Sequence, residues 1–156
     1  MSYKELKSYQ QATITYDYTV EFCNLYVNKT NKSDKSNRSY RMADQMVQAA
    51  RSGKQNIVEG STERTSQKSE LKLLGVARAS LQELLEDYED FLRQRGLAQW
   101  GKDSGEASAV RGLAYRTNRT YWTYKPYLAS PDRAANAAIC LIHQANFLLD
   151  KQIAAL

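Results

Sequence analysis

Two prolines are all that this chain of 156 residues contains, and both fall late, at Pro126 and Pro131. Proline inside a helix removes a backbone hydrogen bond and clashes with the preceding turn, so long helices exclude it. Glycine, the next strongest helix breaker, is also scarce. The first 125 residues are therefore expected to be mostly helical. The length is typical of one domain and suffices to bury a hydrophobic core.

Apolar residues at steps of three and four predict four long helices, at about 8–28, 40–59, 67–95 and 133–153. The third has the strongest signal, a near-heptad series that only an arginine interrupts: Leu71, Leu74, Arg78, Leu81, Leu85, Tyr88 and Leu92. The stretch 97–132 is less regular and is expected to hold a short helix from about Gly105 to Asn118. We expect an all-α single domain, an antiparallel up-down four-helix bundle with a short irregular insert before the last helix.

The first of these helices is the least secure. Its apolar residues alternate with polar ones, as in a half-buried strand: Ile14, Tyr16, Tyr18, Val20 and Phe22. A helical stripe also fits the same stretch: Tyr9, Ala12, Tyr16, Val20, Cys23 and Val27. Helix is favoured, because no second segment alternates and an unpaired strand would lack hydrogen-bond partners.

Small residues indicate a close contact between the second and third helices. Ala49, Ala50, Ser52 and Gly53 lie on one and are expected to face Gly75 and Ala79 on the other. Gly60 is expected to end the second helix. Asn56 is expected to be partly buried against the neighbouring helix, where its amide would fix the register of the hairpin.

The residues do not assemble into a catalytic centre or a metal site. His143 is the only histidine, and it has no nucleophile or acid at a telling spacing. Cys23 and Cys140 are too far apart in sequence for a metal clip and are expected to be reduced thiols. A cluster of acids is expected to form a solvated helix face: Glu83, Glu86, Asp87, Glu89 and Asp90. We expect no enzymatic activity, cofactor or metal.

Two basic sets are candidate contacts for nucleic acid, in keeping with the net charge of +5. The first spans the end of the second helix and the start of the third: Arg51, Lys54, Arg64, Lys68 and Lys72. The second lies in the tyrosine-rich stretch 115–127: Arg116, Arg119 and Lys125. Aromatic rings that stack on bases, interleaved with cations for phosphates, are typical of single-strand binding. Tyrosines are equally typical of protein interfaces, so this stretch also fits assembly alone.

Several short motifs point to a family. The second expected helix carries Asp44-Gln45, then Ala49-Ala50-Arg51-Ser52, then the turn Asn56-Ile57-Val58-Glu59-Gly60. The third continues with an A-x-x-S-L-x-E-L pattern over 77–84, and the last helix, 136–153, fits as well. These motifs resemble the signature of the four-helix-bundle family of ribosomal RNA intervening-sequence proteins. The stretch 97–132 resembles the longer, four helix bundle suffix, branch of that family.

The resemblance implies a non-enzymatic bacterial protein encoded within the intervening sequence of a large-subunit ribosomal RNA gene. It assigns Asn56, Glu59 and Gly60 to the family's structural motif. A related branch is the accessory variability determinant of diversity-generating retroelements, which resembles a homopentamer whose basic surface binds nucleic acid and a reverse transcriptase. The resemblance therefore implies a homopentamer with RNA or DNA, and a reverse transcriptase, as partners.

From sequence, then, the leading hypothesis is a homo-oligomer that binds nucleic acid, most simply RNA, through its basic surfaces. The alternative is an oligomeric protein-interaction scaffold that binds no nucleic acid. No apolar run approaches the roughly 20 residues of a membrane helix, and no signal peptide is recognised. A cytoplasmic location without membrane contact is expected.

Overall fold

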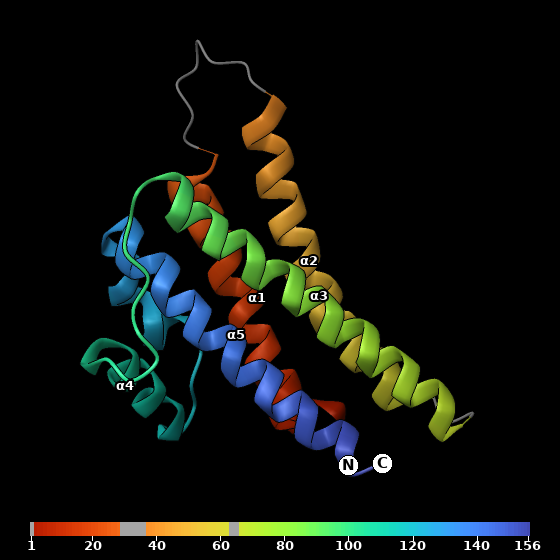
Figure 1. Ribbon diagram of the computed structural model, residues 1–156. Coiled ribbons are helices and arrows are strands. Elements are labelled where there is room, and N and C mark those ends of the chain that lie inside the picture. The colour runs from red at the N-terminus through yellow and green to blue at the C-terminus, as the bar shows by residue number, and fades with distance from the viewer. Residues whose placement is uncertain (1, 29–36, 63–65) are drawn as a thin grey trace.

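The computed structural model describes residues 2–28, 37–62 and 66–156. Four long helices make up most of it: α1 (Lys7–Tyr26), α2 (Asn37–Thr62), α3 (Gln67–Gln94) and α5 (Pro131–Ala154). Successive long helices run in opposite directions, and the two termini lie at the same end of the molecule (Figure 1). Each long helix packs against two others, in the order α1, α2, α3, α5 and back to α1. The predicted all-α antiparallel bundle is confirmed.

Short elements complete the chain. The 3-10 turn η1 (Tyr3–Glu5) precedes α1, and α4 (Gly105–Gly112), η2 (Leu113–Tyr115) and η3 (Tyr121–Ala129) lie between α3 and α5. α4 packs on α5, and η3 packs on both α5 and α1. The expected short helix starts at Gly105 as predicted but ends well before Asn118, which has the left-handed φ of 56°. Among the described helices, none is both long and apolar enough to cross a membrane.

α1 is a helix, as favoured, and not a strand. Two of its threonines fit a helix because their hydroxyls bond to the preceding turn: Thr13 Oγ1 donates to the Tyr9 carbonyl at 2.8 Å, and Thr15 Oγ1 to the Gln11 carbonyl at 2.9 Å. The expected stripe was wrong in part, since Tyr16 and Val20 are only half-buried. The face that enters the core is rotated from that stripe and is wider: Ser8, Gln11, Ala12, Ile14, Thr15, Tyr18, Thr19, Phe22 and Cys23.

The α2–α3 hairpin packs closely, but not as predicted. A Cβ atom added to Gly53 would lie 2.9 Å from Leu81 Cδ2 of α3, so α3 does approach this glycine. Gly75 and Ala79 were wrongly expected to face α2, because both are exposed and a Cβ on Gly75 would meet nothing within 4 Å. The residues of α3 that enter the interior here are Ala77, Ser80, Leu81 and Leu84.

Gly60 does not end α2, which continues to Thr62. A Cβ atom on Gly60 would stand 3.4 Å from Leu73 Cβ and 3.5 Å from the Glu70 carbonyl oxygen. The predicted helix end was therefore wrong. Gly60 is buried against the start of α3, and a Cβ there would make ordinary van der Waals contacts.

Aromatic side chains fill the core toward the end of the bundle where α1 finishes and α3 ends. Phe22 is fully buried and contacts Tyr88 and Phe91 of α3 edge-on, with ring centroids 4.8 and 4.9 Å apart. The buried hydroxyls have partners: Tyr88 pairs with Thr19 at 2.8 Å, and Tyr18 donates to the Ala134 carbonyl at 2.7 Å. These bonds tie α1 to both α3 and α5.

The arginine that interrupts the heptad series of α3 has a structural explanation. Arg78 Nε lies 2.9 Å from Asp150 Oδ1 of α5, with both side chains partly exposed. The ion pair therefore sits at the edge of the α3–α5 interface. Leu71, seven residues (about two turns) before Arg78, is 46% exposed and is not a core position, contrary to the predicted series.

Candidate nucleic-acid interface

The described residues of the first basic set, at the α2–α3 turn, do not all lie on one surface. Lys54 turns toward α1, where its Nζ lies 5.4 Å from the centre of the Tyr16 ring and 6.0 Å from that of Tyr9. Lys68 and Lys72 are exposed one turn apart on α3, which lies diagonally across the bundle from α1. Arg51 is exposed on α2. Arg64 falls outside the described residues.

Lys54 also affects a neighbouring carboxylate. Partial burial raises the pKa of Asp17 on α1, and the Lys54 ammonium opposes that rise. The side chain that was expected to contact phosphate therefore already stabilises the α1–α2 contact. Of the first set, Arg51, Lys68 and Lys72 are exposed and have no ion-pair partner among the described residues.

The aromatic rings of the second set divide into buried and exposed ones. Tyr124 is 1% exposed and belongs to the core, and Tyr127 packs edge-on against Trp100. Trp122 is 60% exposed, and Tyr115 is 91% exposed. Lys125 Nζ stands only 3.9 Å from the centre of the Trp122 ring. Only the exposed rings of this stretch are free to stack on a base, and one of them already carries a lysine.

Arg119 is half-buried and anchored. Its Nη1 donates to Gln11 Oε1 of α1 and to the Tyr124 hydroxyl, each at 2.9 Å. Gln11 is itself fully buried, and its Nε2 donates to the Leu141 carbonyl of α5 at 3.1 Å. These bonds fasten the segment after α4 to the bundle. No carboxylate pairs with Arg119 in the described part of the chain.

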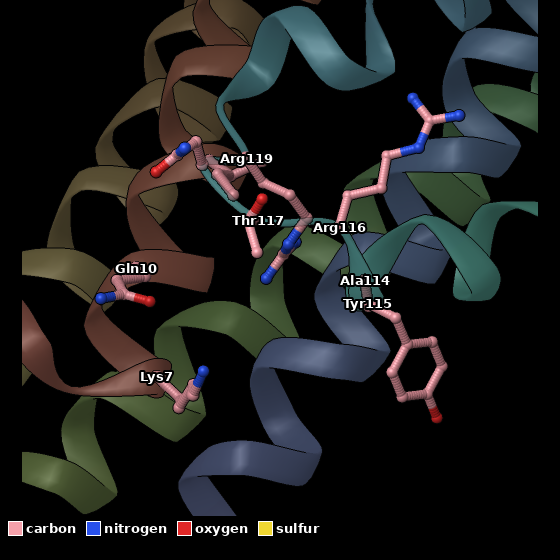
Figure 2. A pocket seen from close by; sticks show the side chains of 9 residues that line it. Lys7, Gln10, Ala114, Tyr115, Arg116, Thr117 and Arg119 are labelled. Carbon is pink, nitrogen blue, oxygen red and sulfur yellow. The ribbon is translucent and has the colours of Figure 1, made fainter.

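The same segment closes one side of a cleft of about 610 Å³. Its lining residues come from α1 and from the stretch 114–119: Lys7, Gln10, Ile14, Ala114, Tyr115, Arg116, Thr117, Asn118 and Arg119. The structure thus brings Lys7 and Gln10 to Arg119, which sequence reasoning missed. In Figure 2 the Arg116 and Tyr115 side chains point away from Lys7 and Gln10, so these two lie at the rim.

One sequence signal could have drawn attention to this region. No acidic residue lies between Glu106 and Asp132, while the same stretch holds four bases. Lys7 could not have been added from sequence, because more than 100 residues separate it from Arg119. Only the packing of η3 and the preceding segment on α1 brings them together.

A serine supported by the structural motif links α2 to α3. Asn56 Nδ2 donates to the Ser52 carbonyl at 2.9 Å and to Ser52 Oγ at 3.1 Å. Ser52 Oγ in turn pairs with Ser80 Oγ of α3 at 2.8 Å. Asn56 was expected to contact the neighbouring helix itself, but its bonds stay within α2, and Ser52 makes the link across. Glu59 is exposed.

The acidic cluster borders a second, shallower groove of about 550 Å³ between α2 and α3. Its acids are Glu83, Glu86 and Asp87. Burial, and after it the nearby carboxylates Asp90, Glu83 and Glu86, raise the pKa of Asp87 to about 6. A groove of this charge repels phosphate, so the nucleic-acid candidates lie elsewhere.

Among the described residues, the other titratable groups do not gather into a metal site. Burial raises the pKa of the Cys23 thiol to about 12, and partial burial lowers the pKa of His143. Within the described ranges, no three His, Cys, Asp or Glu side chains gather closely enough to hold a metal ion.

Asp87 supplies a test of these electrostatics. Its pKa in the folded protein exceeds the ordinary value of 3.8, so folding favours the neutral acid and stability is lost as pH rises through about 6. Asp87→Asn should therefore raise the free energy of unfolding by about 1 kcal/mol at pH 7.5, a figure discounted for the partial exposure of the group. At pH 4.5 most of this gain should vanish. Thermal unfolding at both pH values measures it.

The control is Asp103→Asn, because Asp103 is exposed in the loop before α4. This variant should unfold at the wild-type temperature at both pH values. If Asp87→Asn lowers stability at pH 7.5, the carboxylate of Asp87 has a favourable partner and the assignment is wrong.

Comparison with known proteins places the chain in a family. A family model described as 23S rRNA-intervening sequence protein matches residues 4–100, well over half of the chain. The match covers α1, α2 and α3, and with them the Ser52–Ser80 link and the close-packed Gly53. It ends before the aromatic stretch and α5. No curated protein and no solved structure matches the chain. The chain belongs to the family of 23S rRNA-intervening sequence proteins.

Proposed function

We propose that this protein is a non-enzymatic, homo-oligomeric accessory protein that binds single-stranded nucleic acid, and RNA in particular. The family name associates its members with ribosomal RNA. The net charge of +5 favours an anionic partner. The acid-free stretch that follows α4 provides a surface of matching chemistry.

One observation carries the proposal: the exposed Trp122 ring with the Lys125 ammonium 3.9 Å from its centre. A ring that stacks on a base, next to a cation that neutralises a phosphate, is the combination single-strand binders use. Tyr115 and Arg116 are exposed in the same acid-free stretch and extend the surface. On α3, Lys68 and Lys72 provide further phosphate contacts.

The double variant Trp122→Ala, Lys125→Ala tests this surface. Base stacking on a ring contributes roughly 1–3 kcal/mol per base, so affinity for a single-stranded RNA 12-mer should fall about tenfold or more. The wild-type affinity should also fall steeply as salt rises, because bound counterions are released. Fluorescence anisotropy at several salt concentrations measures both effects.

α5 offers a matched control, since Lys151 Nζ lies 5.1 Å from the centre of the exposed Phe147 ring. The variant Phe147→Ala, Lys151→Ala removes an aromatic–lysine pair of the same kind outside the acid-free stretch. It should bind RNA within about twofold of the wild type. Equal losses in both double variants would show that only net charge matters, and no binding at low salt would reject RNA binding.

The competing proposal is an oligomeric scaffold without nucleic acid, because exposed rings such as Tyr115 and Trp122 are also typical of protein interfaces. A native mass measured together with the 260/280 nm absorbance ratio separates the two. We propose a pentamer with co-purifying RNA. A pentamer free of nucleic acid that also fails to bind RNA would favour the scaffold.

A narrower form of the proposal concerns a retroelement. A diversity-generating retroelement accessory protein would bind a reverse transcriptase as well as nucleic acid. Co-purification with a reverse transcriptase encoded beside the gene tests this form without affecting the broader one.

A further inference from the structure

The cleft between α1 and the stretch 114–119 has the features of a built anion site. Three of its lining residues are cationic, namely Lys7, Arg116 and Arg119, and none is acidic. Its volume of about 610 Å³ is in the range of small-molecule sites. A half-buried guanidinium with no carboxylate partner in the described chain leaves a charge for a ligand to balance.

Arg119 is pre-positioned for that ligand. Gln11 and Tyr124 both accept from Nη1, and Gln11 is held in turn by α5. A guanidinium has five N–H donors, and the Nε and Nη2 donors of Arg119 bond to no group of the described residues. The fixed half of the guanidinium thus orients the other half, which matches a phosphate.

Further donors surround the same space. Lys7 is the first residue of α1, where no side chain caps the helix, so the free backbone N–H groups of the first turn add positive potential. The backbone N–H groups of Thr117, Asn118 and Arg119 likewise donate to no acceptor in the described chain. Gln10 and Asn118 contribute amides, which both donate and accept; one N–H of Gln10 Nε2 donates to the Lys4 carbonyl at 3.0 Å, and its other N–H and its oxygen remain for the edge of a base.

We propose that this cleft holds one unpaired nucleotide of single-stranded RNA, with its phosphate between Lys7 and Arg119. The inference rests on the proposed function and assigns a site that sequence reasoning did not identify. Tyr115, at the rim and pointing outward in Figure 2, is placed to stack on the next base along the strand. The cleft therefore recognises the phosphate, and the exposed rings guide the rest of the strand.

Charge reversal at Lys7 tests the site. Lys7→Glu should weaken binding of the RNA 12-mer about tenfold, whereas Lys4→Glu should weaken it less than threefold. Lys4 is exposed one turn earlier, in η1, and does not line the cleft, so it reports the long-range effect of the same charge change. Equal losses in both variants overturn the site while RNA binding itself stands.

Nuclear magnetic resonance supplies a second readout that does not depend on RNA binding. Titration with uridine monophosphate should shift the backbone amides of Thr117, Asn118 and Arg119, and uridine without phosphate should not. If the monophosphate shifts these amides while the RNA 12-mer does not bind, the cleft is confirmed as a nucleotide site and the proposed function fails. If the 12-mer binds but these amides do not move, the cleft proposal is wrong.

Discussion

Phe22→Ala is expected to lower the free energy of unfolding by about 3–5 kcal/mol, the cost typical of removing a large buried aromatic side chain. Phe22 is fully buried and contacts Tyr88 and Phe91, two rings of the helix diagonally opposite α1. Its loss removes both edge-on contacts and leaves a cavity. The flanking hydroxyl bonds of Tyr88 and Tyr18 keep α1 from collapsing into that cavity. Urea unfolding followed by circular dichroism measures the change.

Phe147→Ala is the matched control, because Phe147 is 58% exposed on α5. The same atoms are deleted there, but most of them already contact water, so the expected cost is under about 1 kcal/mol. The difference between the two variants reports burial, not the chemistry of the substitution. If both variants cost the same, α1 does not pack as the structure shows.

Helix content followed directly from the sequence, but the buried face of α1 did not. Alternating threonines and tyrosines obscured the helical period, since threonine can satisfy its hydroxyl by bonding to the preceding turn. Of the polar residues on the buried face, Thr15 uses this bond, whereas Gln11 bonds to α5 and Thr19 to α3. A stripe drawn through apolar residues alone therefore placed Tyr16 and Val20 in the core and left out Gln11.

Small residues marked the α2–α3 contact correctly on α2 but not on α3. A glycine in a helix can mark a close approach, as at Gly53, or can simply be exposed, as at Gly75. Sequence cannot separate these cases, because the crossing point of two helices depends on the relative rotation of both. The Ser52–Ser80 bond, which defines that rotation, joins two residues 28 positions apart.

The candidate interface was predicted as a region and not as a site. The acid-free stretch held the right residue types, but the structure divided them by burial: Tyr124 entered the core, and Arg119 became an anchor. Lys54 was assigned to phosphate and instead lies over two tyrosine rings of α1. Positive charge near a turn says nothing about which neighbour the side chain meets, and that neighbour decides whether a ligand can reach it.

The family match and the proposed interface occupy different parts of the chain. Residues 4–100 contain the residues that pack α2 on α3, whereas Arg116, Arg119, Trp122 and Lys125 lie beyond the matched stretch. Lys7 lies inside it, so the cleft combines a matched helix with an unmatched segment. Membership of the family therefore supports the packing of α1, α2 and α3 more directly than it supports the proposed nucleic-acid surface.

Gly53→Leu should distinguish the steric cost of the α2–α3 contact from the helix-propensity gain of replacing a glycine. Leucine favours a helix over glycine by somewhat less than the roughly 0.8–1 kcal/mol that separates alanine from glycine, yet its Cβ alone would lie 2.9 Å from Leu81 Cδ2. The rest of the side chain would push α3 off α2 and strain the Ser52–Ser80 bond one position away, a cost of about 3 kcal/mol, which exceeds the propensity gain. Gly75→Leu makes the same change where a Cβ meets nothing, and it should stabilise the protein by up to about 1 kcal/mol. The two variants should therefore change the free energy of unfolding, measured in urea, in opposite directions. If both variants were more stable than the wild type, α3 would not cross α2 at Gly53.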